Sequence, residues 1–168
     1  GGVKATTDRF GHPCGAVHFN GLNGNIEVPN SPSLQTPIKN LTVSCWFMLD
    51  SIAANRGNKW LTLICKGNTY EELYYNPQYR VQVFQSKIQS TISMNTDFTE
   101  YDTNFVKNSF QYGKWYFFAL TYDGKMAKAF VNSELIWEFK YEKTFSQNDA
   151  PLNIGRDIPG DLEYFGGS

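Results

Sequence analysis

The sequence predicts an all-β protein of two packed antiparallel sheets, a jelly roll or sandwich, and three observations lead to this fold class. Residues 114–139 hold three runs of alternating apolar residues, separated by the turns Asp123-Gly124 and Asn132-Ser133, which is the pattern of a β-meander. Aromatic residues make up 16% of the chain and favour half-buried pleated surfaces. No useful stretch shows apolar residues at helical spacing.

The first run of the meander is apolar on both of its faces. Trp115 and Phe117 point to one side of the strand, and Tyr116 and Phe118 point to the other. A strand of this kind belongs in the middle of a sandwich, covered on both sides.

The amino-terminal third is predicted to hold two short strands. Residues 16–19 and 25–28 form a hairpin around the turn at residues 22–24, while residues 1–15 are a surface segment. Residues 29–37 contain three prolines and are expected to be a loop.

The remaining strands follow from alternation and turn residues. Leu41, Val43, Cys45, Phe47 and Leu49 share one face of a strand, with polar and large residues between them. Polar loops are expected at residues 51–58 and 95–109. Further strands are predicted at residues 60–65 (ended by Lys66-Gly67-Asn68), 79–84, 89–94 and 152–154.

Length and charge limit the classes of partner. The 168 residues fit one domain, 1–168, and the net charge of −1 argues against a nucleic-acid partner. No apolar run approaches the ~20 residues that cross a bilayer, so membrane insertion is not expected.

The start at Gly1-Gly2 is expected to be a boundary made by processing or cloning. Cys45 and Cys65 lie in apolar runs and are expected to be buried free thiols, with one disulfide and one free thiol among the three cysteines as the alternative.

Several motifs in order resemble laminin-G-like domains of the concanavalin A-like lectin/glucanase superfamily. These motifs are Asp8-Arg9-Phe10-Gly11, Ala16-Val17-His18-Phe19-Asn20-Gly21, Leu41-Thr42-Val43-Ser44-Cys45-Trp46-Phe47, Ile64-Cys65-Lys66-Gly67, Thr121-Tyr122-Asp123-Gly124 and Leu152-Asn153-Ile154-Gly155. The resemblance covers most of the chain and implies a concanavalin A-like jelly roll. It also implies an exported, extracellular or cell-surface protein of bacterial origin.

The chain departs from this family at its ends. Members continue after a turn such as Phe165-Gly166-Gly167 into one more strand, and they often carry a strand before Gly2-Val3. We therefore expect a longer natural protein, in which a terminal strand or neighbouring domains cover edges that this chain leaves open.

No catalytic residues are predicted. Glucanases of the superfamily carry closely spaced acids along one strand, and the acids here do not follow that pattern. Glycoside hydrolysis is kept as the alternative from another function class.

Calcium is the one cofactor that the resemblance implies. Asn20 and Asn23 occupy hairpin positions where the family often has Asp, and Ca²⁺ prefers oxygen ligands. The alternative is that both amides serve only turn geometry.

The predicted carbohydrate-binding residues are Trp60, Tyr70, Tyr75, Tyr79, Arg80 and Gln82, supported by Arg56 and Tyr101 in neighbouring loops. Sugars stack their apolar faces on aromatic rings and hydrogen-bond to planar polar groups. Strand alternation separates Arg80 and Gln82 from Val81 and Val83, so these two polar side chains are expected to face a groove. The alternative is that the tyrosines are ordinary rim residues of a sandwich.

The sequence therefore predicts a non-catalytic, lectin-like module that binds a glycan or a glycosylated protein on its concave sheet or rim loops. A structural or adhesive spacer without a small ligand is the remaining alternative.

Overall fold

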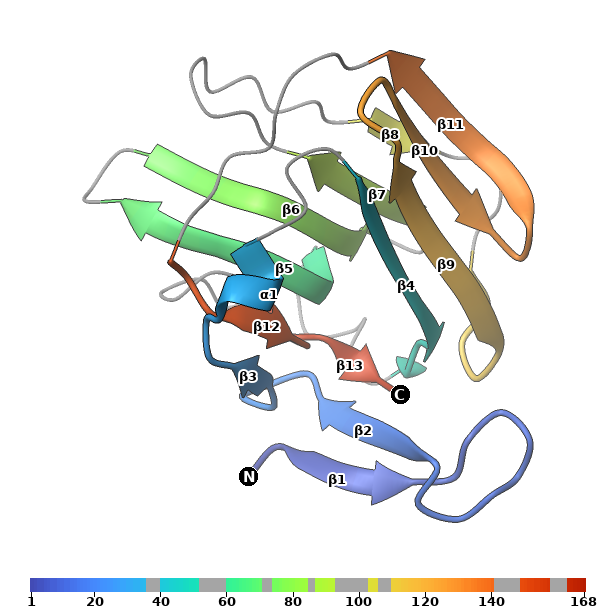
Figure 1. The fold of residues 1–168 in the computed structure, drawn as a ribbon. Coiled ribbons are helices and arrows are strands. Elements are labelled where there is room, and N and C mark those ends of the chain that lie inside the picture. Colours follow the sequence, from blue (N-terminus) through green and yellow to red (C-terminus); the bar gives the residue numbers. More distant parts are fainter. Residues whose placement is uncertain are drawn as a thin grey trace.

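The computed structural model describes residues 1–35, 40–51, 60–70, 74–84, 87–92, 103–105, 110–140, 149–157 and 163–168, and these segments form an all-β sandwich (Figure 1). Its amino-terminal elements are β1 (Val3–Thr6), β2 (Ala16–Asn20), β3 (Ile26–Val28), α1 (Pro32–Gln35) and β4 (Leu41–Met48). The middle of the chain contributes β5 (Trp60–Tyr70), β6 (Tyr74–Phe84), β7 (Lys87–Ile92) and β8 (Thr103–Phe105). The remaining strands are β9 (Trp115–Tyr122), β10 (Met126–Val131), β11 (Glu134–Lys140), β12 (Leu152–Ile154) and β13 (Gly166–Gly167).

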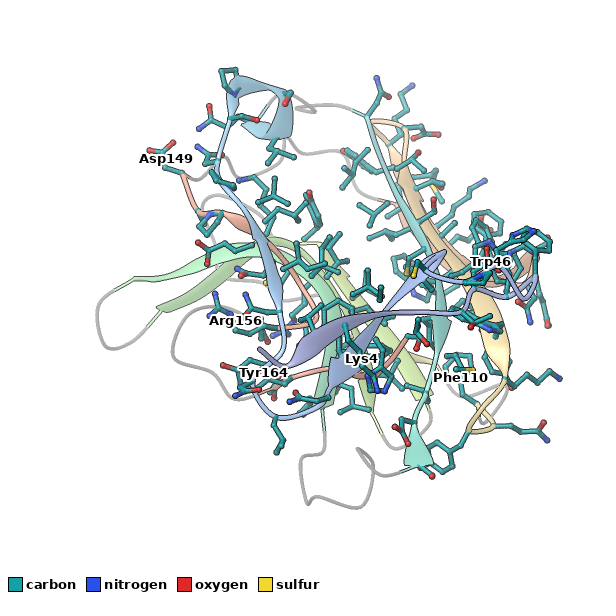
Figure 2. All side chains as sticks on the ribbon, turned by 90° about the horizontal axis from the view of Figure 1, so that it is seen from below. Lys4, Trp46, Phe110, Asp149, Arg156 and Tyr164 are labelled. Carbon is teal, nitrogen blue, oxygen red and sulfur yellow. The ribbon has the colours of Figure 1, made fainter. Side chains whose placement is uncertain are left out.

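Within the described residues the strands form three antiparallel sheets. The orders are β11-β10-β9-β4, β3-β12-β5-β6-β7-β8 and β1-β2-β13. Seen from below, the four-stranded and six-stranded sheets lie on opposite sides of the molecule (Figure 2). Their facing side chains form one hydrophobic core that includes Phe47, Phe118, Leu120, Val81 and Val83.

The predicted meander is confirmed as β9, β10 and β11. Asn132 and Ser133 both have positive φ, 49° and 71°, as a tight two-residue hairpin turn requires. On β9, Tyr116 and Phe118 are buried, whereas Trp115 and Phe117 are half-buried. The expected covering of β9 on both faces is therefore complete only on the core face.

The alternation predicted for residues 41–49 is also confirmed. Val43, Phe47 and Leu49 are buried, and Trp46 between them is 42% exposed. Trp46 lies on the side of β4 that is turned away from the six-stranded sheet (Figure 2). The period of two thus separates core from surface along this strand.

The predicted hairpin of residues 16–28 is wrong. β2 pairs with β1 and β13, whereas β3 pairs with β12 in another sheet. Asn20 and the glycines after it do turn the chain, but the turn carries it from one sheet to the next. The amino-terminal surface segment also contains a strand, β1, which is stabilised by its pairing with β2.

Other boundaries differ from the prediction because pairing extends strands beyond their apolar runs. β5 and β6 form a hairpin from Trp60↔Phe84 to Tyr70↔Tyr74, so Lys66-Gly67-Asn68 does not end the strand. The short helix α1 lies in the predicted 29–37 loop, and β8 lies in the predicted 95–109 loop. The predicted loop at 51–58 falls almost wholly outside the described residues.

The three cysteines are free thiols, as the sequence favours: Cys14 is exposed, Cys45 half-buried and Cys65 buried. In the described part of the chain, no helix is long or apolar enough to span a membrane.

Candidate functional site

Five polar side chains form a connected group on the face of the six-stranded sheet that is turned away from the core. We call Thr62, Arg80, Gln82, Asp157 and Glu163 the polar cluster. Gln82 Nε2 donates to Thr62 Oγ1 at 2.8 Å and to Asp157 Oδ2 at 2.9 Å, and it also bonds to Glu163 Oε2. Arg80 Nη1 donates to the same Asp157 oxygen at 3.2 Å. One amide group therefore joins two carboxylates.

Strand geometry explains why these residues meet. Arg80 and Gln82 are two apart on β6, so they share a face. Their partners on β5 are Cys65 and Thr62, and a bulge between Thr62 and Ile64 brings both to that face. Asp157 and Glu163 arrive from the segment after β12, where Thr62 N donates to Glu163 O at 3.3 Å.

The cluster is mostly closed to solvent. Thr62, Arg80, Gln82 and Asp157 are buried, and Glu163 is partly exposed. Burial and the neighbouring Asp157 carboxylate raise the pKa of the Cys65 thiol well above its ordinary value, so this thiol stays protonated and is no nucleophile. Arg80 and Gln82 do not line an open groove, because both side chains are buried and bonded to Asp157, and Gln82 also bonds to Glu163.

The other predicted binding residues are spread along the β5–β6 hairpin. Tyr79 packs in the core with Val81, and burial raises its pKa to about 12. Trp60 is half-buried and shares a face with Thr62, two residues along β5.

Tyr70 and Tyr75 lie at the other end of the hairpin, where the structure describes only the backbone. Tyr70 is ten residues from Trp60, or about 33 Å along an extended strand. The predicted residues are therefore not gathered into one small site. Arg56 and Tyr101 lie outside the described residues.

The sequence reading missed the two carboxylates at the centre of the cluster. Asp157 and Glu163 lie in a turn-rich stretch after a short strand, and neither follows an alternating pattern. The available signal was indirect: Arg80 and Gln82 lie on a strand between buried valines, and buried polar groups need partners from elsewhere in the chain.

Calcium does not fit the two predicted amides as they stand. Asn20 Oδ1 accepts backbone N–H bonds from Leu22 (2.9 Å), Asn23 (3.2 Å) and Gly24 (3.2 Å). Asn20 Nδ2 donates to Asn23 Oδ1 at 2.9 Å, so backbone donors occupy the Asn20 oxygen and the Asn23 oxygen already accepts one bond. Among the described residues no group of three His, Cys, Asp or Glu side chains is placed to hold a metal. Calcium binding stays a prediction.

Chemically, the polar cluster offers a rigid set of hydrogen-bonding groups beside an aromatic ring. Trp60, Glu163 and Tyr164 are each partly exposed, and the backbone of Tyr164 pairs with that of Thr62. Figure 2 shows Tyr164 and Arg156 on the side of the six-stranded sheet, away from Trp46. Two hydrogen bonds hold the Arg156 side chain against β12 and β3. Arg156 Nη2 donates to Asn153 Oδ1 at 2.8 Å and to Glu27 Oε2 at 3.0 Å.

Comparison with solved structures shows folds of the same kind. The CBM40 of the Ruminococcus gnavus IT-sialidase matches with a TM-score of 0.62 and 16% identity, over 87% of this chain and 86% of that chain. Domain 4 of AbnA, a GH43 extracellular arabinanase from Geobacillus stearothermophilus solved with arabinotriose, matches with a TM-score of 0.66 and 16% identity, over 99% and 72%. Domains LG4-5 of the mouse laminin alpha1 chain match with a TM-score of 0.60 and 12% identity, over 89% and 38%. At these identities the likeness shows the fold alone.

The family comparison is more specific. A comparison with curated protein sequences gives no match. The model of the laminin-G-like family described as "Concanavalin A-like lectin/glucanases superfamily" matches residues 20–168, which is most of the chain. Four of the six motifs that carry the sequence resemblance, those from Leu41 to Gly155, fall inside this range. The chain therefore belongs to the laminin-G-like domains of the concanavalin A-like lectin/glucanase superfamily.

Proposed function

We propose that the protein is a non-catalytic carbohydrate-binding module of an exported protein, and that it binds a glycan over the polar cluster. The observation that carries this proposal is the placement of half-buried Trp60 beside a hydrogen-bonded group of polar side chains on one sheet face. Solved structures of similar fold include a CBM40 bound to alpha2,3 sialyllactose and an arabinanase domain in complex with arabinotriose, which supports a glycan ligand.

Each side chain has a distinct part in this proposal. The indole of Trp60 stacks on the apolar face of a sugar ring, and the Glu163 carboxylate accepts hydrogen bonds from sugar hydroxyls. Gln82 holds Glu163 in place, because its amide bonds to that carboxylate and to Asp157. Arg80 and Asp157 are positioning residues that keep Gln82 in one orientation.

The alternative function is glycoside hydrolysis, because the polar cluster contains two carboxyl groups close to each other. Asp157 and Glu163 both bond to Gln82 Nε2, and a retaining glycosidase needs two carboxyl groups about 5–5.5 Å apart. However, Asp157 is fully buried and paired with Arg80, so a sugar carbon has no path to its oxygen. We therefore favour binding without catalysis.

A glycan array, followed by calorimetry on each bound glycan with and without Ca²⁺, tests the proposal. Trp60→Ala is expected to weaken binding about tenfold, which corresponds to about 1.4 kcal/mol. Glu163→Gln is expected to weaken it by a similar factor because the charged acceptor is lost.

Trp46→Ala is the matched control, since Trp46 is an exposed tryptophan on the opposite sheet. Its affinity is expected to equal that of the parent chain. An array with no binding to any glycan would favour the spacer alternative. Release of sugar from a chromogenic glycoside, abolished in Glu163→Gln, would favour the hydrolase.

A further inference from the structure

Arg156 lies on the side of the six-stranded sheet that carries the polar cluster, and only part of its guanidinium is used (Figure 2). Nη2 makes both of its hydrogen bonds, to Asn153 Oδ1 and to Glu27 Oε2. Nε is buried without an acceptor among the described residues. Nη1 forms no hydrogen bond with any described residue, and it belongs to the 19% of the side chain that is exposed. The donors of Nη1 are therefore open to a ligand.

Asn153 holds this guanidinium in position. Leu152 and Ile154, its neighbours on β12, pack against the core, so the Asn153 side chain faces away from it, and it is fully buried. Its Nδ2, like Arg156 Nε, is buried without an acceptor in the described part of the chain. Buried donors of this kind are rare in proteins and call for an explanation, such as a functional role or a bound water. A buried amide thus fixes the orientation of a partly exposed arginine.

Glu27 is a weak and replaceable partner of Arg156. The Glu27 side chain is 52% exposed, and a single bond, from Nη2, joins the two groups. Exposed ion pairs contribute little, because water solvates both charges and the side chains lose freedom when they pair. A ligand carboxylate in the place of Glu27 can accept from Nη1 and Nη2 together, which is the bidentate arrangement that suits a guanidinium. The exchange therefore gains one hydrogen bond at Arg156.

The strand register places Arg156 and the polar cluster on one continuous face. One row of residues crosses β3, β12, β5 and β6 on this face: Glu27, Asn153, Cys65 and Arg80. Neighbouring strands are about 4.8 Å apart, so Asn153 is about 10 Å from Arg80 across the sheet. Trp60 is five residues from Cys65 along β5, or about 16 Å. A glycan that reaches from Trp60 to Arg156 is therefore an oligosaccharide rather than a single sugar.

The two ends of this face differ in charge. At the cluster end, Arg80 is paired with Asp157, and the Glu163 carboxylate is partly exposed. A ligand carboxylate at that end would be repelled by Glu163. At the other end, displacement of Glu27 leaves the positive charge of Arg156 without its partner. An acidic group of the ligand is therefore accommodated at Arg156, and hydroxyl groups are accommodated at Glu163.

We propose that Arg156 binds the carboxylate of an acidic sugar, which displaces Glu27, and so selects acidic oligosaccharides over neutral ones. Asn153 is the positioning residue that keeps the guanidinium in place. This inference rests on the glycan site proposed over the polar cluster, and it names the class of sugar that the site accepts.

Calorimetry on acidic oligosaccharides and on their methyl esters tests this selection, because the ester keeps the shape of the sugar and removes its charge. The probes are sialyllactose and trigalacturonate. The acid is expected to bind at least about tenfold more tightly than its ester. Arg156→Gln is expected to abolish this difference by weakening the binding of the acid alone. Arg156→Lys, which keeps the charge and loses the bidentate geometry, is expected to retain only part of it.

Glu27→Gln gives a result that misfolding cannot imitate, because a gain is expected. Removal of the competing carboxylate should raise the affinity for the acid about threefold and leave the affinity for the ester unchanged. Arg9→Gln is the matched control, since Arg9 is an exposed arginine that stacks on Trp46 of the four-stranded sheet. It is expected to change neither affinity.

The outcomes separate this inference from the glycan site on which it rests. Equal binding of acid and ester, or an acid preference that survives Arg156→Gln, overturns the role of Arg156. Unchanged or weaker binding of the acid by Glu27→Gln overturns the exchange of carboxylates. Binding of neutral glycans alone, weakened by Trp60→Ala, overturns acid selection and supports the glycan site. No binding to any glycan overturns both proposals.

Discussion

Arg80 and Asp157, 77 residues apart in the chain, form an ion pair inside the molecule. Arg80 Nη1 lies 3.2 Å from Asp157 Oδ2, and the two side chains are 10% and 0% exposed. The pair ties β6 to Asp157, which lies shortly after β12. Such a pair is costly to break, because removal of one partner leaves the other charge buried.

Asp157→Asn is therefore expected to lower the free energy of unfolding by about 3 kcal/mol, measured by urea denaturation. The matched control is Glu138→Gln, which breaks the Lys128–Glu138 pair at 3.6 Å on the surface. An exposed pair of this kind contributes less than about 1 kcal/mol. Equal losses in the two variants would contradict a structural role for the buried pair.

The turn after β10 offers a stabilising change. Ser133 has φ of 71°, a conformation that costs a residue with a Cβ more than it costs glycine. Ser133→Gly is expected to raise the free energy of unfolding by about 0.5–1 kcal/mol, measured from the urea midpoint at constant m-value. Ser133→Val is expected to lower it, since a β-branched residue tolerates positive φ least. A loss of stability in the glycine variant would argue against the left-handed turn.

Alkaline pH is expected to destabilise the fold through the Cys45 thiol, which packs against the core. The Cys45 side chain is partly buried against the hydrophobic core, and this desolvation raises the pKa of its thiol from 9.0 to about 12. Above pH 9 the unfolded chain releases this proton while the folded chain keeps it, so stability falls as pH rises toward 12. One such group contributes a slope of about 1.4 kcal/mol per pH unit.

Cys45→Ala should therefore flatten the decline in unfolding free energy between pH 9.5 and 11 by about that slope, in urea titrations at each pH. Cys14→Ala is the matched control, because Cys14 is an exposed free thiol. It is expected to leave the slope unchanged. Identical slopes in the parent chain and the Cys45 variant would place the Cys45 thiol in contact with water.

Calcium addition tests the amides of the β2–β3 turn. Because Asn20 Oδ1 already accepts three N–H bonds, about 1 mM Ca²⁺ is expected to leave the melting temperature unchanged. A bound ion at 100 times its Kd would add about 2.7 kcal/mol. Asn20→Ala is expected to cost about 1–2 kcal/mol with or without the ion, since three backbone donors lose their acceptor. A calcium-dependent rise that Asn20→Ala removes would establish the metal site.

The parts of the fold that sequence reading predicted are those where local pattern and final burial agree. Alternation along residues 41–49 gives the face of every residue in β4, because this strand is buried on one side only. The pair Asn132-Ser133 predicts the tight turn, because the positive φ angles that the turn requires depend on these two residues alone. The β1 strand lacks such a pattern: its residues are exposed or half-buried, and its pairing with β2 is what makes it a strand.

The site was harder to predict than the fold, since its members come from separate segments. Strand parity places Tyr79 with Val81 in the core, so this assignment was open to sequence reasoning. The burial of Arg80 and Gln82 was not, because it depends on Asp157 and Glu163, which come from a distant part of the chain. Trp60 keeps the environment that a sugar-stacking residue needs, half-buried beside polar groups, and its role stays a prediction.

The pairing of β13 with β2 has a consequence for how the chain acquires its structure. Phe19 and Gly167 meet only after nearly the whole chain has been closed into a loop. Loop closure of this length is entropically costly, and folds dominated by distant pairings form slowly, in milliseconds to seconds. The hairpin of β5 and β6 and the meander of β9 to β11 can form early from neighbouring residues. The β2–β13 contacts cannot form before residues 166–168 have been made, so until then a nascent chain leaves this edge of β2 unpaired.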